Sequence, residues 1–317
     1  MSIAIGIEIG GTKLQAGIGF NNDQLITLSR KQVDVERGAE GIREAIPVLI
    51  DDVIEKAQIS RNDICGVGVG FGGPIDSKKG ITLLSHQIDG WDGFPLRDWL
   101  SDHCQAPVAI QNDASLAGYA EARMGAGKGF SRVFYMTIGS GIGGGWIVDG
   151  VIDEGQGLGA AEIGHTWVPH PDDCEPDKLE NICSGWGIGA RAREAVEEGE
   201  STIMKNLANG DVSVIDAKIV YTAAEQDDLL ACAILDGTCN ALAVSICNTI
   251  ALLNPERFII GGGVSMMGPL FWDALQKRVE QNSFNPFAGT FSLVPAALGE
   301  DVVVVGGVLL GMEICDK

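Results

Sequence analysis

The stretch Ile3-Ala-Ile-Gly-Ile-Glu-Ile-Gly-Gly-Thr-Lys13 joins an apolar, β-branched run to a carboxylate, two glycines, a hydroxyl and a lysine. Because the run is apolar nearly throughout rather than alternating, it predicts a strand buried on both faces. Gly10 and Gly11 allow a tight turn and a close approach of the backbone to a ligand, and a second strand-like run follows. The pattern predicts a strand-turn-strand hairpin, which is either an ordinary turn or part of a phosphate-binding site.

The same hairpin pattern recurs near the middle of the chain. Residues 132–148 again place an apolar strand, a turn rich in glycine, serine and threonine, and a second strand in that order. A third glycine-rich stretch, at residues 261–263, follows a short buried strand and precedes a predicted helix at residues 269–280. Two similar hairpins predict two related lobes with a cleft between them. Backbone N–H groups from both lobes would hold the phosphates of a nucleoside triphosphate, with Mg²⁺ neutralising their charge.

Composition argues against several classes of partner. The chain has 317 residues, is 45% hydrophobic and carries a formal net charge of −21, and its length suits two domains or one large one. Because nucleic acids and anionic membranes attract clustered Lys and Arg, neither is expected as a partner. The first residues show no basic, apolar export signal, and the eight cysteines have no paired spacing. We therefore expect a cytoplasmic protein with reduced, mostly buried thiols.

Strands and helices alternate along the chain, which indicates the α/β class. Residues 38–58 have helical spacing, interrupted by Pro47, which predicts a kink or a late start. A glycine-rich strand ends at residues 72–74, and a strand over residues 108–112 leads into a small-residue helix. The end of the chain predicts a strand at residues 302–305 and then a helix at 306–314. The apolar segment 231–253 contains polar residues and predicts a buried helix rather than a membrane span.

Asp113 is the leading candidate for catalysis. It follows Asn112 at the end of a predicted strand and precedes a helix, so either residue is placed to cap that helix. A carboxylate at this position can also accept the proton of an attacking hydroxyl, as phosphoryl transfer requires. The two roles are compatible, and we favour catalysis.

Two more polar residues have two interpretations each, and a third, Glu180, shows no local sign of a site. Glu162 and His165 lie three apart among glycines, either as ordinary loop residues or as hydrogen-bonding partners for the adjacent hydroxyls of a sugar. Glu180 precedes an apolar run, where a carboxylate near a helix start is favourable on electrostatic grounds alone. The residues themselves leave these alternatives open.

Six motifs, taken in order, resemble those of the ROK family (repressors, uncharacterised frames and sugar kinases). They are Glu8-Ile-Gly-Gly-Thr-Lys13, Gly72-Gly-Pro74, Gln111-Asn-Asp113, Thr137-Ile-Gly-Ser-Gly-Ile-Gly-Gly-Gly145, Glu162-Ile-Gly-His165, and Leu179-Glu180 with Ser184-Gly185. The resemblance covers essentially the whole chain. It implies an α/β protein with a two-domain, actin-like (ribonuclease-H-like) ATPase fold and a cleft between the domains. The expected domains are residues 1–113 plus 300–317, to which the last helix returns, and residues 114–299.

The resemblance also implies a role for individual residues. It makes the chain an ATP- and Mg²⁺-dependent sugar kinase in which Asp113 is the general base. The implied sugar-binding residues are Gly73, Asn112, Glu162, His165 and Glu180. The implied nucleotide-binding residues are Gly10, Gly11, Thr12, Lys13, Thr137, Gly139, Ser140, Gly141, Gly261, Gly262 and Gly263. We expect phosphorylation of glucose at the 6-hydroxyl by a homodimer. An N-acetylhexosamine kinase, a fructokinase and a catalytically degenerate, sugar-binding or regulatory member are the alternatives.

Glu8 is one departure from the family pattern, because the family usually has Asp there. We expect Glu8 to hold Mg²⁺ through water. A repressor is a second hypothesis within the family. We expect no N-terminal helix-turn-helix domain, since the first strand begins at Ile3, and the negative charge argues against DNA.

A second departure concerns the loop before Glu180. Most family members carry zinc-binding cysteines there, and the matching positions in this chain are Pro171, Asp173 and Lys178, which supply no thiolate. The nearby cysteine and histidine residues, Cys174, Cys183, His165 and His170, fit no standard zinc spacing, so zinc is not expected. We expect packing to hold the loop, together with an ion pair of Asp172 or Asp173 with Lys178.

Overall fold

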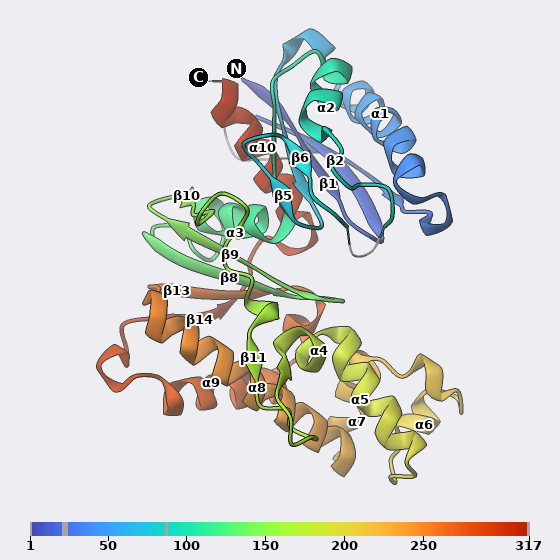
Figure 1. Cartoon of the computed structure of the whole chain (residues 1–317), viewed down its shortest axis with the longest axis vertical. Coiled ribbons are helices and arrows are strands. Elements are labelled where there is room, and N and C mark those ends of the chain that lie inside the picture. The colour runs from blue at the N-terminus through green and yellow to red at the C-terminus, as the bar shows by residue number, and fades with distance from the viewer. Residues whose placement is uncertain (1, 21–24, 86–87, 316–317) are drawn as a thin grey trace. The chain divides into compact units, whose positions relative to one another are not determined.

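Each of the two glycine hairpins belongs to a five-stranded sheet (Figure 1). The computed structural model describes residues 2–20, 25–85 and 88–315. Contacts divide the chain into two compact units. The first unit comprises Met1–Ser131, Gly145–Ala161 and Ala297–Lys317, and the second comprises Arg132–Gly144 and Glu162–Ala296. The domain boundary expected at residue 113 stays a prediction; the contact-based unit continues past it to Ser131.

The first sheet has the strand order β3-β2-β1-β4-β7. Its strands are β1 (Ile3–Ile9), β2 (Lys13–Phe20), β3 (Leu25–Gln32), β4 (Ile64–Phe71) and β7 (Val108–Asn112). The first three strands pair antiparallel, whereas β1, β4 and β7 run parallel. The other elements of this part of the chain are α1 (Gly38–Ala57), β5 (Ile75–Asp76), β6 (Ile81–Thr82), α2 (Leu96–Cys104), α3 (Asp113–Met124) and α10 (Val302–Cys315).

The second sheet has the order β10-β9-β8-β13-β14. Its strands are β8 (Arg132–Ile138), β9 (Ile142–Val148), β10 (Val151–Ile152), β13 (Arg257–Gly261) and β14 (Ser292–Pro295). The connecting elements are β11 (Trp167–Val168), β12 (Asp177–Lys178), α4 (Leu179–Cys183), α5 (Gly185–Glu197), α6 (Met204–Leu207), α7 (Ala217–Ala224), α8 (Leu229–Leu253) and α9 (Pro269–Asn282).

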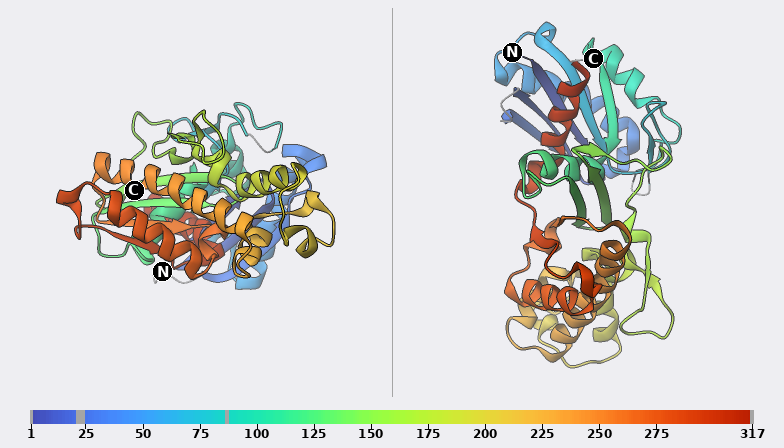
Figure 2. Two further views of the ribbon diagram at one scale, coloured as in Figure 1. Left: turned by 90° about the horizontal axis from the view of Figure 1, so that it is seen from below. Right: turned by 90° about the vertical axis from the view of Figure 1, so that its left-hand side faces the viewer.

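Strand β1 is buried on both faces, as its sequence predicts. Its isoleucines share a hydrophobic core with α1, because side chains of one strand alternate between the two faces. On the other face α10 lies against β1 and β4, and Figure 2 shows this C-terminal helix lying along the strands. A Cβ added to Gly6 would lie 2.0 Å from the Val304 carbonyl oxygen, and one added to Gly68 would lie 2.1 Å from that of Gly307. Glycine therefore permits backbone-to-backbone packing between helix and sheet.

One expectation about secondary structure is wrong, and so is one of the two alternatives expected around Pro47. Residues 302–305, predicted as a strand, form the first turn of α10. The four consecutive valines there favour a strand locally, but burial of the helix against the glycine-lined sheet overrides that preference. Helix α1 begins at Gly38 and continues through Pro47, so it has no late start.

The cysteine expectation is also partly wrong. Cys65 on β4 and Cys315 at the end of α10 form a disulfide across a sequence separation of 250 residues. Of the remaining thiols, Cys174 and Cys232 are exposed rather than buried. The contact between α10 and β4 places the two bonded sulfurs together, and no local spacing in the sequence could signal it.

Helix α8 corresponds to the apolar segment that the sequence assigns to the interior. By length and composition it is apolar enough to cross a membrane, but 61% of its most apolar window is buried within the protein. It also lies against α7 and α9. These contacts agree with the predicted buried helix.

Candidate active site

The three parallel strands of the first sheet, β1, β4 and β7, end side by side at one edge of the sheet. The last residue of β1, Ile9, pairs with Phe71 of β4, which pairs with Asn112 of β7. The N–H of Gly72 continues this alignment by donating to the Ile9 carbonyl at 2.8 Å. In sheets of this kind, ligands bind beyond the carboxyl ends of the strands. The residues that follow the three strands are therefore the first candidates for contact with a substrate.

Asp113 lies at this edge and faces the glycine turn. Its Oδ1 accepts a 2.8 Å hydrogen bond from the N–H of Ala114. A Cβ added to Gly72 would lie 3.3 Å from Asp113 Oδ2, 3.3 Å from the Ile9 carbonyl oxygen and 3.5 Å from the Cα of Gly10. Asp113, the predicted base, thus lies close to the β1–β2 turn, which is predicted to bind phosphate.

Asn112 caps α3 and also reaches Gly73. Its Oδ1 accepts from the N–H of Ser115 at 3.1 Å, which confirms the predicted cap. Its Nδ2 donates to the Gly73 carbonyl oxygen at 3.3 Å. The first unit therefore brings together three predicted site residues, Gly73, Asn112 and Asp113.

The turn between β1 and β2 is narrow. The N–H of Gly10 donates to the Lys13 carbonyl at 3.1 Å, and a Cβ on Gly10 would lie 3.2 Å from the same oxygen. A larger residue would crowd the Lys13 carbonyl, so the geometry of the turn favours glycine at position 10. Thr12 is exposed, and Gly11 and Lys13 are half-buried.

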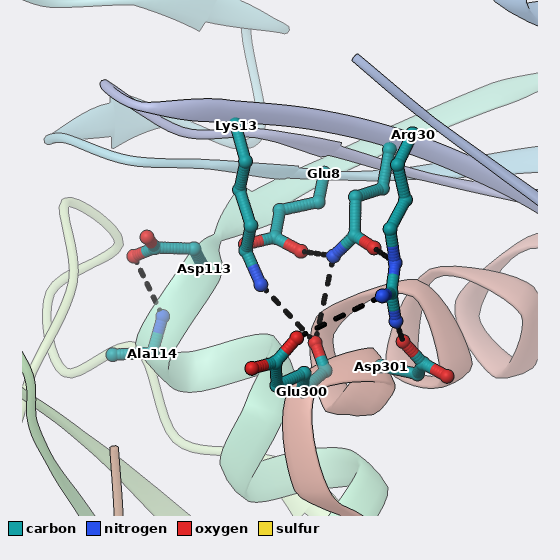
Figure 3. A network of polar contacts seen from close by, with 8 residues as sticks. Glu8, Lys13, Arg30, Asp113, Ala114, Glu300 and Asp301 are labelled. Carbon is teal, nitrogen blue, oxygen red and sulfur yellow. Dashed lines mark hydrogen bonds and ion pairs between the residues drawn. The ribbon is translucent and has the colours of Figure 1, made fainter. Parts of the chain in front are cut away.

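A row of polar side chains crosses the first three strands beneath this turn (Figure 3). Glu8, Gln15 and Arg30 are direct cross-strand partners on β1, β2 and β3. Gln15 is fully buried; its Nε2 donates to Glu8 Oε2 at 2.6 Å, and its Oε1 accepts from Arg30 Nε at 2.5 Å. Arg30 also pairs with Asp301, next to the start of α10. The row thereby connects the first hairpin to the C-terminal segment.

Lys13 completes this arrangement above Glu8. Its Nζ lies 3.4 Å from Glu8 Oε1 and donates to the Glu300 carbonyl oxygen at 3.2 Å. Burial raises the pKa of the Glu8 carboxyl, while the charge of Lys13 and the hydrogen bond from Gln15 oppose that rise. Lys13 is therefore held at the β1–β2 turn by a buried carboxylate and a backbone carbonyl.

Glu8 fits a metal role only through water. Both of its oxygens have protein partners, and among the described residues no group of three or more His, Cys, Asp or Glu side chains is arranged to hold a metal ion. Mg²⁺ usually keeps several waters and binds through one or two carboxylates together with substrate phosphates. One buried carboxylate beside the turn that is predicted to bind phosphate is compatible with that chemistry.

The second unit contains its own glycine turn, between β8 and β9. The N–H of Gly139 donates to the Gly141 carbonyl at 2.9 Å, and the N–H of Gly185 donates to the Gly139 carbonyl at 2.7 Å. Glu180 Oε2 accepts from the N–H of Ile142 at 2.7 Å, and a Cβ on Gly141 would lie 2.6 Å from that oxygen. Glu180, predicted to bind sugar, is thus also a support of the predicted nucleotide-binding turn.

The other predicted residues of this unit surround the same turn. Glu162 precedes a short 3₁₀ turn, Ile163–His165, whose last residue is His165, and both side chains are exposed. That turn lies against the hairpin, because a Cβ on Gly164 would be 2.2 Å from the Ile142 carbonyl oxygen. Gly262 lies equally close to β8: its φ is +83°, and a Cβ there would be 2.5 Å from the Ile138 carbonyl oxygen.

Some contacts were not predicted from the sequence. Four residues of the polar row around Glu8 were not identified from the sequence: Gln15, Arg30, Glu300 and Asp301. Gln15 could have been found, because it is a polar residue within an apolar strand. The ion pair expected for the loop before Glu180 is wrong: Asp172 pairs with Arg191 on α5. Asp173 accepts from the N–H groups of Cys174 and Glu175.

Comparisons with known proteins agree on one family. The ROK family model matches residues 4–313. The chain is 31% identical over 306 residues to the glucokinase of Thermotoga maritima, covering 95% of each. It is 31% identical over 308 residues to the glucokinase of Halalkalibacterium halodurans, covering 96% of this chain and 93% of the relative. The crystal structure of a ROK family glucokinase from Streptomyces griseus with glucose and AMPPNP matches with a TM-score of 0.82 and 28% identity, covering 98% of this chain and 100% of that one.

Proposed function

The chain belongs to the ROK family and is an ATP-dependent sugar kinase with the two-domain, actin-like ATPase fold; from this premise we propose that it phosphorylates glucose at the 6-hydroxyl, with Asp113 as the general base. One observation carries the proposal. Asp113 Oδ2 faces Gly72, at the edge where the β1–β2 turn begins. A base beside a phosphate turn is the arrangement that transfer from a nucleotide to a hydroxyl requires.

Asp113 has the position and support of a base. Strand β7 ends at Asn112, so the carboxylate stands at the start of α3. The N–H of Ala114 donates to Oδ1, and Oδ2 lies on the side of Gly72. In the reaction the sugar hydroxyl gives its proton to Asp113 as its oxygen attacks the γ-phosphorus of ATP, and ADP leaves.

Each unit carries some of the other residues that we propose for sugar binding. Asn112 and the backbone at Gly73 belong to the first, and Glu162, His165 and Glu180 belong to the second. Carboxylates accept from sugar hydroxyls, whereas imidazole and amide groups both donate and accept. Exposure of the Glu162 and His165 side chains leaves them accessible to a ligand. Glu180 would bind sugar while its Oε2 supports the hairpin.

The two glycine turns would bind the nucleotide. Gly10, Gly11, Thr12 and Lys13 form the first, and Thr137, Gly139, Ser140 and Gly141 form the second. Gly261, Gly262 and Gly263 would lie near the nucleoside. Mg²⁺, bound to the phosphates and held by Glu8 through water, would neutralise charge on the transferred group. Lys13, fixed by Glu8 and Glu300, would bind a phosphate oxygen directly.

Glucose is preferred because the two curated relatives described above are glucokinases and the matched crystal structure contains glucose. A Glu-His-Glu set recognises pyranoses in general, so an N-acetylhexosamine and fructose remain the competing substrates. A degenerate member without turnover is the alternative outside catalysis. The homodimer stays a prediction. So does the cytoplasmic location, and the Cys65–Cys315 disulfide removes the argument for it from reduced thiols.

A coupled assay of ADP release over a panel of hexoses and N-acetylhexosamines tests the proposal. We expect the highest kcat/KM with glucose, in the presence of ATP and Mg²⁺. Greater efficiency with another sugar would transfer the assignment to that substrate. Absence of release with every sugar would support the degenerate alternative.

A further inference from the structure

Arg191 is a charged side chain buried inside the second unit. It lies on α5 with 5% of its side chain exposed, whereas its partner Asp172 is 53% exposed. Its Nε donates to Asp172 Oδ2 at 2.5 Å, and its Nη1 donates to Thr238 Oγ1 on α8 at 3.0 Å. A longer contact of 3.5 Å joins Nη1 to the Ile234 carbonyl. One guanidinium therefore connects a surface loop to two helices.

The loop also contacts α8 independently of the ion pair. Asp172 belongs to residues 169–176, which connect β11 to β12. A Cβ on Gly237 of α8 would lie 2.6 Å from the Cβ of Pro171 and 3.0 Å from Arg191 Nη2. Glycine is disfavoured inside a helix, so this close approach gives a physical reason for its presence at position 237.

The same loop leads directly to Glu180. Strand β12 pairs with β11 through Trp167–Lys178 and Val168–Asp177. The N–H of Leu179, the first residue of α4, donates to the Thr166 carbonyl at 2.9 Å. Glu180 follows and accepts from the hairpin N–H of Ile142. Displacement of the loop would therefore be transmitted along a short, hydrogen-bonded segment to Glu180.

We propose that Arg191 and Asp172 form a positioning pair that orders the 169–176 loop and thereby sets the position of Glu180. Lys178 forms no ion pair with Asp172 or Asp173, although the structure describes all three. Arg191, rather than Lys178, is the partner of Asp172. The kinetic consequence of this pair rests on the proposed function, whereas its effect on the loop does not.

Burial of Arg191 is what makes the pair effective. A buried charge that loses its partner is strongly unfavourable. Any loop conformation that removes Asp172 leaves the guanidinium without its counter-ion, so such conformations are depleted. The pair thus restricts the conformations of the 169–176 loop. This loop has a two-residue strand at each end and no regular structure between them.

The first test replaces Arg191 with methionine, which keeps an unbranched apolar chain and removes the charge. We expect faster amide hydrogen exchange in residues 172–178 than in the wild type. We also expect kcat/KM for the sugar to fall by about 10- to 100-fold, because small displacements of binding groups have effects of that size. Both are measured well below the thermal midpoint, where each protein stays folded and unfolding does not lower kcat/KM.

Arg193→Met is the matched control. Arg193 lies on the same helix, but its Nη1 donates to the Ile215 carbonyl at 2.6 Å, away from the loop. We expect wild-type exchange in residues 172–178 and an unchanged kcat/KM. Asp172→Glu should keep loop exchange and kcat/KM close to the wild-type values, because the carboxylate is retained. Asp172→Ala combined with Arg191→Met should be no worse than Arg191→Met alone, since interacting residues are not additive.

The outcomes separate the two proposals. Unchanged loop exchange and unchanged kcat/KM in Arg191→Met would overturn the positioning pair, and so would equal effects of Arg193→Met. If Arg191→Met does not fold, Asp172→Ala at the exposed partner gives the same measurement. If the wild type phosphorylates no sugar, the proposed function fails, while hydrogen exchange still tests the pair.

Discussion

Gln15 donates a 2.6 Å hydrogen bond from Nε2 to Oε2 of Glu8, its direct cross-strand partner in the first sheet. Gln15 is fully buried, and its other end accepts from Arg30. The hydrogen bond favours the ionised form of a carboxyl whose pKa burial has raised. Gln15 therefore favours the charged form of Glu8 opposite Lys13, at the turn proposed to bind phosphate.

Gln15→Leu should shift the pH dependence of the reaction. Loss of the donor raises the pKa of Glu8 further, so the acid limb of kcat/KM should move to higher pH. Lys13, Asp301 and Arg30 are the charged groups around Glu8, and all three remain in the variant. The check is a profile of kcat/KM against pH for both proteins. An identical acid limb would show that Glu8 ionisation does not matter for turnover.

The raised pKa of Glu8 also makes the stability of the protein depend on pH. The pKa of Glu8 is raised above its ordinary value of 4.5, so between pH 4.5 and the raised value the folded state binds more protons than the unfolded state. Its contribution to stability is complete below 4.5 and decreases as pH rises through the raised value. Burial is the principal cause of the raised pKa. Glu8→Gln should therefore remove this pH-dependent loss of stability, which urea unfolding over the same pH range measures.

Glu8 itself can be tested by two substitutions. If it holds Mg²⁺ through water and orients Lys13, Glu8→Asp should preserve or raise activity. Glu8→Gln should lower kcat/KM by about 10- to 100-fold, as loss of groups around a metal's direct ligands does. Titration of the rate with Mg²⁺ measures the effect. Full activity in Glu8→Gln at limiting Mg²⁺ would exclude both roles.

Gly68→Ala tests the packing of α10 on the first sheet. The new methyl group would lie 2.1 Å from the Gly307 carbonyl oxygen, so helix and strand must separate. We expect a loss of at least about 1–3 kcal/mol, as overpacking typically causes, seen as a lower thermal midpoint. Gly263→Ala is the control, since a Cβ there meets nothing within 4 Å. Equal midpoints for the two variants would contradict the observed packing.

Cys315→Ser tests the disulfide between α10 and β4. A cross-link of this kind stabilises mainly by restricting the unfolded chain, and native disulfides are typically worth about 2–4 kcal/mol. The oxidised wild type should therefore unfold at higher urea concentration than the variant. A reductant should remove the difference. Equal stability without reductant would mean that Cys65 and Cys315 are not joined in the purified protein.

Much of the first unit follows from local sequence rules. The all-apolar run before Glu8 predicts a strand covered on both faces, and Asn112 before a small-residue helix predicts a cap; both are confirmed. These features depend on neighbouring residues, so one sequence is enough to find them. The repeated glycine hairpin likewise indicates a second sheet of related design, and that sheet is present.

The missed features depend on residues far apart in the chain. Glycine in β4 has a packing role only because α10 lies on it, and the same contact turns the valine run into helix and brings Cys65 to Cys315. Arg191 could not be assigned to Asp172, because nothing in the sequence says which side of α5 faces the loop. Local patterns locate the chemical groups, whereas tertiary contacts determine their partners.

The central claim is that Asp113 is the base of a sugar kinase, and the most direct measurement is ADP release by Asp113→Asn with glucose, ATP and Mg²⁺. Asparagine retains the size of the side chain but cannot accept the proton. The account predicts a fall in kcat on the order of 10²-fold or more, as general-base losses give, with glucose binding by calorimetry retained. Near-normal turnover in this variant would contradict it.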